Sequence, residues 1–115
     1  MPTLDSIQAV LESAMRGAWT RQTVLTQNLA NSETPGYQPL QLNFQAALRE
    51  AVANGEPPET VNYAPEVELA QATPNGNGVS MEREAAQLAE NGLDYETLSG
   101  LLNAHDETLR AAIGI

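Results

Sequence analysis

Cysteine and lysine are both missing from this chain, and positive charges are few. The absence of cysteine excludes disulfides, thiolate chemistry and cysteine-ligated zinc. Five arginines stand against 15 acidic residues, so the formal net charge is −10. Nucleic-acid phosphates are bound by clustered Lys and Arg, and an anionic membrane surface repels an acidic chain. We therefore expect no nucleic-acid partner and no direct lipid insertion.

Long apolar runs and bulky aromatic side chains are also scarce. No run approaches the roughly 20 apolar residues of a membrane span, and the N-terminus lacks the pattern of a secretory signal peptide. Only five aromatic residues occur among 115, and alanine supplies much of the apolar share. A compact globule of this size normally has more bulky side chains in its core. Long helices that need partners fit this composition better.

Residue groups that could carry catalysis or bind a metal are equally sparse. His105-Asp106 is the one histidine–carboxylate pair, and general-base chemistry needs a third group and an enclosed pocket. A solvated or subunit-contacting histidine is the stronger interpretation, and a small hydrolase using His105 is the weaker one. The run Asn75-Gly76-Asn77-Gly78 resembles half of a calcium loop, but Val79 stands where a ligand oxygen is needed. We expect no catalytic residue, no cofactor and no metal site.

Residues 4–30 predict one long amphipathic helix. Its apolar residues recur three and four positions apart, which is the spacing of one helix face. They are Leu4, Ile7, Leu11, Ala14, Ala18 and Leu25. Ala14 and Ala18 would let a partner helix approach closely, whereas Trp19 offers one large side chain for packing. Packing within the monomer and packing between subunits remain equal alternatives for this stripe.

The stretch Asn28-Leu29-Ala30-Asn31-Ser32-Glu33-Thr34-Pro35-Gly36-Tyr37 ends this helix and turns the chain. Asn31 predicts a C-terminal cap in the left-handed conformation. Pro35 cannot continue a helix and favours extended geometry at Thr34. Pro35-Gly36 is typical of a tight turn with positive φ at the glycine. Tyr37 has a large ring with a polar tip, which suits a helix–loop junction or a subunit contact.

The middle of the chain predicts one short helix followed by mostly irregular structure. Apolar residues share one helix face, and Asn54-Gly55 ends the helix; they are Phe44, Ala47, Leu48, Ala51 and Val52. Prolines and Asn-Gly pairs punctuate residues 55–78. The alternations Val61/Tyr63 and Val67/Leu69 allow one or two short strands.

A second long helix is predicted to begin near Ser80, which can cap it. Glu82 and Glu84 would place negative charge at its positive end, and with Glu90 and Arg83 they predict a solvated face. The apolar stripe of this helix comprises Met81, Ala85, Leu88, Gly92, Tyr95, Leu102, Leu109 and Ile113. Gly92 inside the helix indicates a close approach or a weak hinge.

These patterns predict an all-α fold in which the long N- and C-terminal helices pack as an antiparallel, coiled-coil-like hairpin. Three parts follow: residues 1–37 with the first helix and turn, residues 38–78 as the middle segment, and residues 79–115 with the last helix. The apolar stripes are wide, so a hairpin alone would leave apolar surface uncovered.

Several strings resemble the bacterial flagellar basal-body rod protein family. Asn28-Leu29-Ala30-Asn31, Thr34 and Pro35-Gly36-Tyr37 are similar to the motif that closes the family's N-terminal helix. The order Gly76-Asn77-Gly78-Val79, Met81-Glu82-Arg83-Glu84, Leu88-Ala89-Glu90-Asn91 and Tyr95 resembles the start of its C-terminal helix, and Leu109-Arg110-Ala111-Ala112-Ile113 resembles its terminus. The short length points to the proximal rod type.

The resemblance implies a structural subunit and no enzyme. Such a subunit assembles into a helical tube that transmits motor torque and forms part of the export channel. Its partners would be copies of itself, other flagellar rod proteins, and proteins of the rod–membrane-ring junction and the export gate. The chain would leave the cytoplasm through the flagellar type III system without a cleaved signal peptide. The alternative is a soluble helical-hairpin adaptor or secretion chaperone that forms a discrete oligomer.

Residues expected at assembly contacts come from both apolar stripes and from the turn. They are Leu11, Ala14, Ala18, Trp19, Leu25, Asn28, Asn31, Thr34, Pro35, Gly36, Tyr37, Leu88, Tyr95, Leu102 and Leu109.

Overall fold

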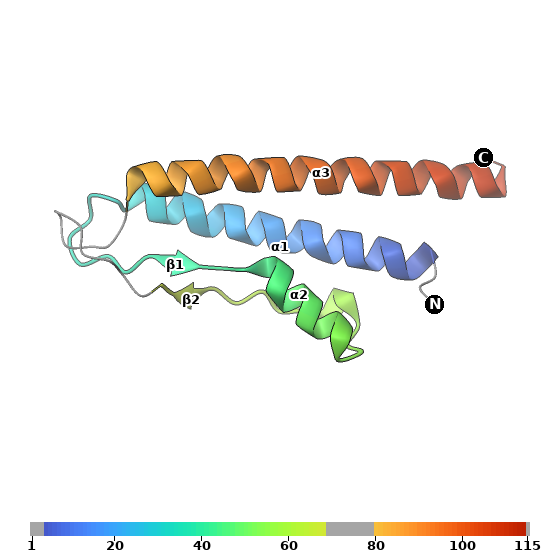
Figure 1. The fold of residues 1–115 in the computed structure, drawn as a ribbon, viewed down its shortest axis with the longest axis horizontal. Coiled ribbons are helices and arrows are strands. Elements are labelled where there is room, and N and C mark those ends of the chain that lie inside the picture. Colours follow the sequence, from blue (N-terminus) through green and yellow to red (C-terminus); the bar gives the residue numbers. More distant parts are fainter. Residues whose placement is uncertain (1–3, 69–79, 115) are drawn as a thin grey trace.

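Two long antiparallel helices run side by side along the molecule (Figure 1). The computed structural model describes residues 4–68 and 80–114. Helix α1 spans Leu4–Ala30 and helix α3 spans Met81–Ile113, and the two chain ends lie at the same end of the pair. The molecule is elongated and flat, with extents of 59 × 27 × 14 Å. The predicted all-α hairpin is confirmed.

The middle of the chain forms a second layer on α1, opposite α3 (Figure 1). Its elements are β1 (Leu40–Gln41), α2 (Phe44–Ala53), the 3₁₀ turn η1 (Pro58–Thr60) and β2 (Glu66–Val67). β1 and β2 pair antiparallel, with Leu40 opposite Val67. Helix α1 therefore lies between α3 and the middle layer, and side chains of α3, among them Leu98 and Arg83, reach the middle layer.

Local signals set the helix ends. The Ser80 hydroxyl accepts a hydrogen bond from the Arg83 N–H at 3.3 Å and caps α3, as predicted. Helix α2 ends at Ala53 and is capped by Asn54, which is followed by Gly55 with φ of +73°. The Glu56 N–H bonds to the Ala51 carbonyl at 2.9 Å, which completes a Schellman motif. The predicted end of α2 is confirmed.

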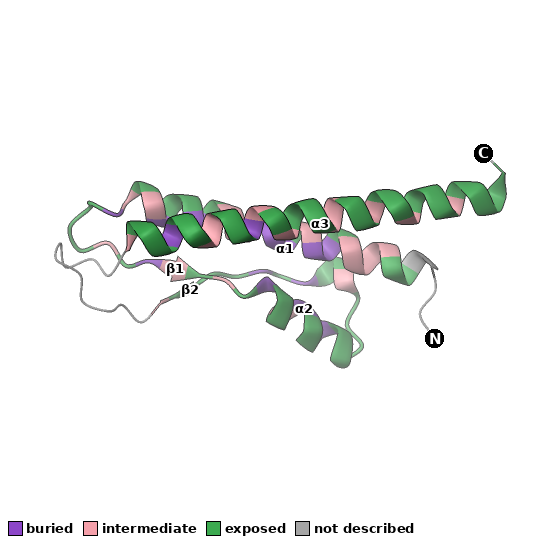
Figure 2. Cartoon of the chain, turned by 45° about the horizontal axis from the view of Figure 1, so that its top comes forward, coloured by how far each residue is buried: buried purple, intermediate pink, exposed green. Residues whose placement is uncertain are grey.

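The main hydrophobic core lies between α1 and the middle layer (Figure 2). Its buried members are Ala14, Ala18, Phe44, Leu48, Ala51, Val61 and Tyr63. From α3 only the partly buried Leu98 packs against this cluster. The fully buried side chains of α3 are instead the polar Glu84 and Asn91. Hydrophobic burial thus attaches the middle layer to α1. The buried side chains that attach α3 to α1 are polar.

Gly17 allows a close approach between these layers. A Cβ atom built on Gly17 would lie 2.7 Å from the Cβ of Phe44 and 2.9 Å from the Cε1 of Tyr63. Real Cβ atoms do not come this close to their neighbours, so glycine is what brings the Phe44 ring against α1. Gly92 has no neighbour within 4 Å of its built Cβ and lies within the continuous α3, so the predicted close approach there is wrong.

The strands differ from the expected ones. Val67 lies in β2, as the alternation allowed, but Val61 and Tyr63 lie in extended backbone without a strand partner and point into the core. Strand β1 was not expected at all. The Asn-Gly pairs at residues 75–78 and the position of Leu69 lie outside the described residues. No helix of the described chain is long and apolar enough to span a membrane.

Candidate functional site

A tight turn follows α1 and sends the chain back along the helix. The Tyr37 N–H donates to the Thr34 carbonyl at 3.2 Å, and Gly36 has φ of +76°. This geometry is typical of a type II turn with proline and glycine at its two central positions. The predicted Pro35-Gly36 turn is confirmed.

Asn31 does not adopt the predicted left-handed cap, because every described residue with positive φ is a glycine. Helix α1 ends through tighter turns, in which the Thr34 N–H bonds to the Asn31 carbonyl at 3.0 Å. The Asn31 side chain donates to the Gln27 carbonyl at 2.9 Å and accepts from the Thr34 hydroxyl at 3.1 Å. Its amide thus bonds one of the last helix carbonyls, so no left-handed residue is needed.

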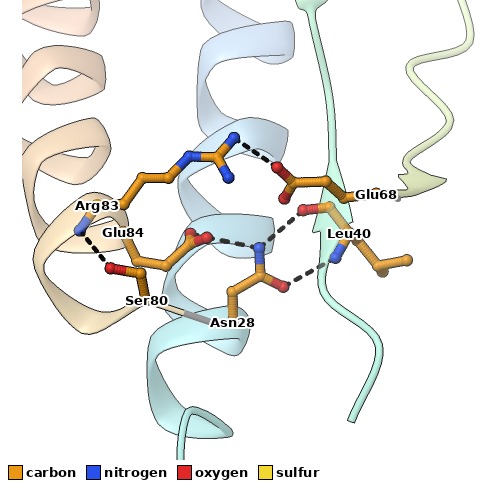
Figure 3. Close-up of polar contacts among 6 residues, drawn as sticks. All are labelled: Asn28, Leu40, Glu68, Ser80, Arg83 and Glu84. Carbon is orange, nitrogen blue, oxygen red and sulfur yellow. Dashed lines mark hydrogen bonds and ion pairs between the residues drawn. The ribbon is translucent and has the colours of Figure 1, made fainter. Parts of the chain in front are cut away.

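The Asn28 side chain joins four parts of the chain, and Figure 3 shows its bonds to β1 and to α3. Its Nδ2 donates to the Leu40 carbonyl at 2.7 Å and to the Glu84 carboxylate at 3.3 Å. Its Oδ1 accepts from the Leu40 N–H at 3.0 Å and from the Tyr37 hydroxyl at 3.1 Å. The side chain is completely buried, and all its polar atoms are used. Asn28 therefore ties the end of α1 to the turn, to β1 and to the start of α3.

Glu84 carries a carboxylate into this buried cluster and is only 2% exposed. Burial raises its pKa, and Glu68 adds to the rise, while the hydrogen bond from Asn28 and the charges of Arg83 and Arg21 oppose it. The predicted solvated face is wrong for Glu84, because α3 docks with this residue turned towards α1. Arg83, on the outer side, forms an ion pair with Glu68 (Figure 3).

The Tyr37 phenol responds to the same buried charge. Burial and the negative charge of Glu84 both raise the pKa of Tyr37. The phenol therefore stays protonated and keeps donating to the Asn28 oxygen. The end of the molecule that carries the turn is thus held by hydrogen bonds with fixed directions.

Asn91 makes a second polar connection between α1 and α3. Its Nδ2 donates to the Ala18 carbonyl at 2.9 Å and to the Gln22 side chain at 3.0 Å. Its Oδ1 accepts from the Arg21 guanidinium at 3.3 Å. Asn91 is 1% exposed, so water does not compete for these bonds.

An aromatic pair lies on the outside of the hairpin. The rings of Trp19 and Tyr95 have centroids 6.4 Å apart and are tilted by 54°. Trp19 is 64% exposed, which is unusual for so large an apolar side chain. Other exposed large apolar residues on the two helices are Ile7, Met81, Leu93, Leu101 and Ile113. Exposed tryptophan and tyrosine side chains are enriched at protein interfaces.

Two grooves flank α3 within the described chain. One of about 400 Å³ is mostly apolar and lies between α2 and α3, with Phe44, Leu48 and Leu98 in its lining. The other, of about 760 Å³, lies between the middle layer and the start of α3. Its charged lining residues are Arg21, Glu50, Glu66, Glu68, Arg83 and Glu90.

The described residues do not bring acidic or histidine side chains together as a metal site would require, since they contain no cluster of three or more such ligands. His105 is half-buried on α3. Its neighbour Asp106 forms an ion pair with Arg110 one turn along, with an O–N distance of 3.1 Å. The carboxylate is thus paired with a guanidinium of its own helix.

Comparisons with known proteins identify relatives along most of this chain, although no protein-family model matches it. The flagellar basal body rod protein FlgB of Escherichia coli (strain K12) is 32% identical over 85% of this chain and 88% of its own length. The chain belongs to the FlgB family. The FlgB protein of Salmonella typhimurium is 31% identical over 81% of this chain and 84% of its own, and that of Cereibacter sphaeroides is 36% identical over 82% and 83%.

In this FlgB-family chain the residues expected at assembly contacts differ in exposure. Those buried within the subunit are Ala14, Ala18, Leu25 and Asn28. Those half-buried are Leu11, Asn31, Tyr37, Leu88, Leu102 and Leu109. Those exposed are Trp19, Thr34, Pro35, Gly36 and Tyr95. The structure brings Trp19 and Tyr95 together, and it places the exposed turn residues at one end of the molecule.

Sequence reasoning missed the residues that attach the middle layer to α1 in this FlgB-family fold. The Arg16 guanidinium donates to the Val61 carbonyl at 2.7 Å and stacks over the Tyr63 ring, 5.2 Å from its centroid. The Ser13 and Tyr63 hydroxyls form a buried hydrogen bond of 2.8 Å. The available signal was Gly17, because glycine is unfavourable inside a helix and indicates a close approach when it occurs there.

Proposed function

We propose that this chain is a structural subunit of the flagellar basal-body rod, in its proximal part. The observation that carries the proposal is the similarity to FlgB proteins over more than 80% of both chains. A chain that matches a rod protein over most of both lengths is expected to assemble in the same way.

The shape of the subunit supports an assembly of aligned helices. Helices α1 and α3 run together along the 59 Å axis, and the exposed Trp19 and Tyr95 lie across both. Apolar side chains exposed on a rigid helical pair are covered when copies pack side by side. Contacts between different faces of neighbouring copies do not close and generate a helical tube. Parallel packing of many helices would give the tube the stiffness to transmit motor torque.

We assign the three parts of the chain different positions in this tube. Residues 1–37 and 79–115 would form the inner layer around the export channel, and residues 38–78 would pack outside. The exposed turn at Thr34, Pro35 and Gly36 would contact a neighbour along the tube. The partners are copies of this chain, other rod proteins, and proteins of the membrane-ring junction and the export gate. Export would use the flagellar type III system without a cleaved signal.

A charge placed on the aromatic pair tests this proposal. Trp19→Glu, introduced in place of the native gene, should leave helix content unchanged, because Trp19 is exposed and outside the core. Rod assembly in isolated basal bodies and swimming should be lost, because an unpaired charge would be buried at the subunit contact. Ala46→Glu is the matched control, since it adds the same charge at an exposed position of α2. It should assemble.

Two results would overturn the proposal. The first is normal rods and motility with Trp19→Glu. The second is sedimentation of the purified chain at one fixed mass across concentrations, together with basal bodies that lack the chain, which would indicate a discrete helical-hairpin adaptor.

A further inference from the structure

Helices α1 and α3 pack on each other, and each carries a set of apolar residues that repeats every seven positions. The repeating residues are Leu11, Ala18 and Leu25 on α1, and Leu88, Tyr95, Leu102 and Leu109 on α3. A seam with such a repeat does not define one alignment. If α3 slid by seven residues, or about 10 Å, apolar residues would again face apolar residues.

Three buried polar residues interrupt this repeat. Asn28 and Glu84 contact each other across the helix pair, and Asn91 contacts the Ala18 carbonyl of α1. Their exposed fractions are 0%, 2% and 1%. Each contact needs a donor on one helix and an acceptor on the other at the same position along the helix axis.

We propose that Asn28 and Asn91 determine the register of α3 on α1. The inference concerns the fold of one subunit and does not depend on the proposed function. A single polar residue in an apolar helix seam can select one register over others, because every other register buries it without a partner.

Both slipped registers break the Asn91 contacts. In one direction Glu84 takes the place of Asn91, and a carboxyl group has at most one O–H, whereas Asn91 donates to both the Ala18 carbonyl and the Gln22 side chain. In the other direction Leu98 takes that place, and the half-buried Arg21 and Gln22 lose their partner. The apolar seam alone would permit either slip.

Distances between two spin labels can measure the register directly. The chain has no cysteine, so Thr26→Cys on α1 and Ala104→Cys on α3 provide two labelling positions. Both positions are exposed, and neither belongs to the seam. A slip by seven residues changes their separation along the helix axis by about 10 Å. The otherwise unchanged chain should give one distance.

The double variant Asn28→Leu and Asn91→Leu removes both side-chain amides that would select the register. Leucine is apolar and similar in size to asparagine, so the space between the helices stays filled. The population of slipped registers should rise at least about tenfold, since each buried hydrogen-bonding group left unpaired shifts an equilibrium by roughly that factor. Ser13→Ala is the matched control: it removes a buried hydrogen bond to Tyr63 and leaves α3 untouched. Its label distance should stay unchanged.

A second variant moves the selecting residue instead of removing it. Asn91→Leu with Leu98→Asn places the amide seven residues further along α3. The label distance should then shorten, because α3 must slide to bring position 98 opposite the Ala18 carbonyl. One unchanged distance in both variants would overturn the proposal. Loss of helix content in both, seen by circular dichroism, would also overturn it, since the asparagines would then maintain the fold and not choose a register.

Discussion

The side-chain amide of Asn28 lies 3.3 Å from the carboxylate of Glu84, and both side chains are almost completely shielded from water. One amide donor replaces only part of the hydration that an ionised carboxylate loses on burial. The ionised form of Glu84 is therefore disfavoured in the folded chain, and folding and protonation are linked at this position.

Stability of the chain should rise in mild acid because of Glu84. Burial raises the pKa of Glu84, so the folded chain holds this proton to a higher pH than the unfolded chain does. The stability that protonation adds is fully present below the unfolded pKa and is lost as pH rises through the folded pKa. Glu84→Gln has no proton to lose and should gain less stability than the wild type between neutral and mildly acidic pH. Urea unfolding at the two pH values measures this gain.

Glu82→Gln is the control for that measurement, since it makes the same change on the exposed side of the same helical turn. It should keep the gain of the wild type. An equal gain in the wild type and in Glu84→Gln would show that other groups produce the pH dependence.

A methyl group at Gly17 should destabilise the fold, although alanine is normally the better helix former by about 1 kcal/mol. The added Cβ would lie 2.7 Å from the Phe44 Cβ and 2.9 Å from the Tyr63 ring. Overpacking of this kind costs about 1–3 kcal/mol. Gly17→Ala should therefore lower the free energy of unfolding in a urea titration.

Gly92→Ala should have the opposite effect. Its Cβ meets no atom within 4 Å, so the helix preference for alanine acts alone. We expect a stabilisation of up to about 1 kcal/mol. If both substitutions changed stability in the same direction, the close approach at Gly17 would not be the reason for its glycine.

Features set by neighbouring residues could be predicted from the sequence. Ser80 caps α3, Asn54-Gly55 ends α2, and Pro35-Gly36 makes the turn, because each depends on backbone preferences within a few positions. The long helices followed from apolar spacing. Their antiparallel packing followed from the need of two wide stripes to cover each other.

Features set by distant residues could not be predicted. Asn28 and Glu84 are 56 positions apart, and nothing around Glu84 distinguishes it from the exposed Glu82. The β1–β2 pair is two residues long on each side, and it forms where β1 lies along α1 and β2 returns beside β1. From the sequence, Gly17 indicates only a position that weakens the helix. Its role becomes clear from the structure, in which Phe44 packs against it. The sequence therefore predicted the apolar helix faces and the Pro35-Gly36 turn of the candidate site. It did not predict the buried hydrogen bonds of Asn28, Glu84 and Asn91.

A β-branched residue at Gly36 should impair assembly more than it impairs the subunit. Gly36 has φ of +76°, a conformation that costs an L-residue about 1–2 kcal/mol, and its surroundings are open. Gly36→Val should therefore distort the exposed turn while the helices keep their content in circular dichroism. If the turn contacts a neighbouring subunit, basal bodies from a strain carrying Gly36→Val should have few rods.

Gly36→Asn distinguishes two causes of an assembly defect at this position: strain in the turn backbone, and the presence of any side chain. Asparagine adopts the left-handed conformation more readily than valine does, so this variant should keep the turn and assemble rods close to the wild-type level. Equal defects in both variants would mean that the neighbour needs a position without a side chain, not a turn of this shape. Normal rods and swimming with Gly36→Val would remove the turn from the assembly contacts, because a strained and displaced turn could not fit the same neighbour.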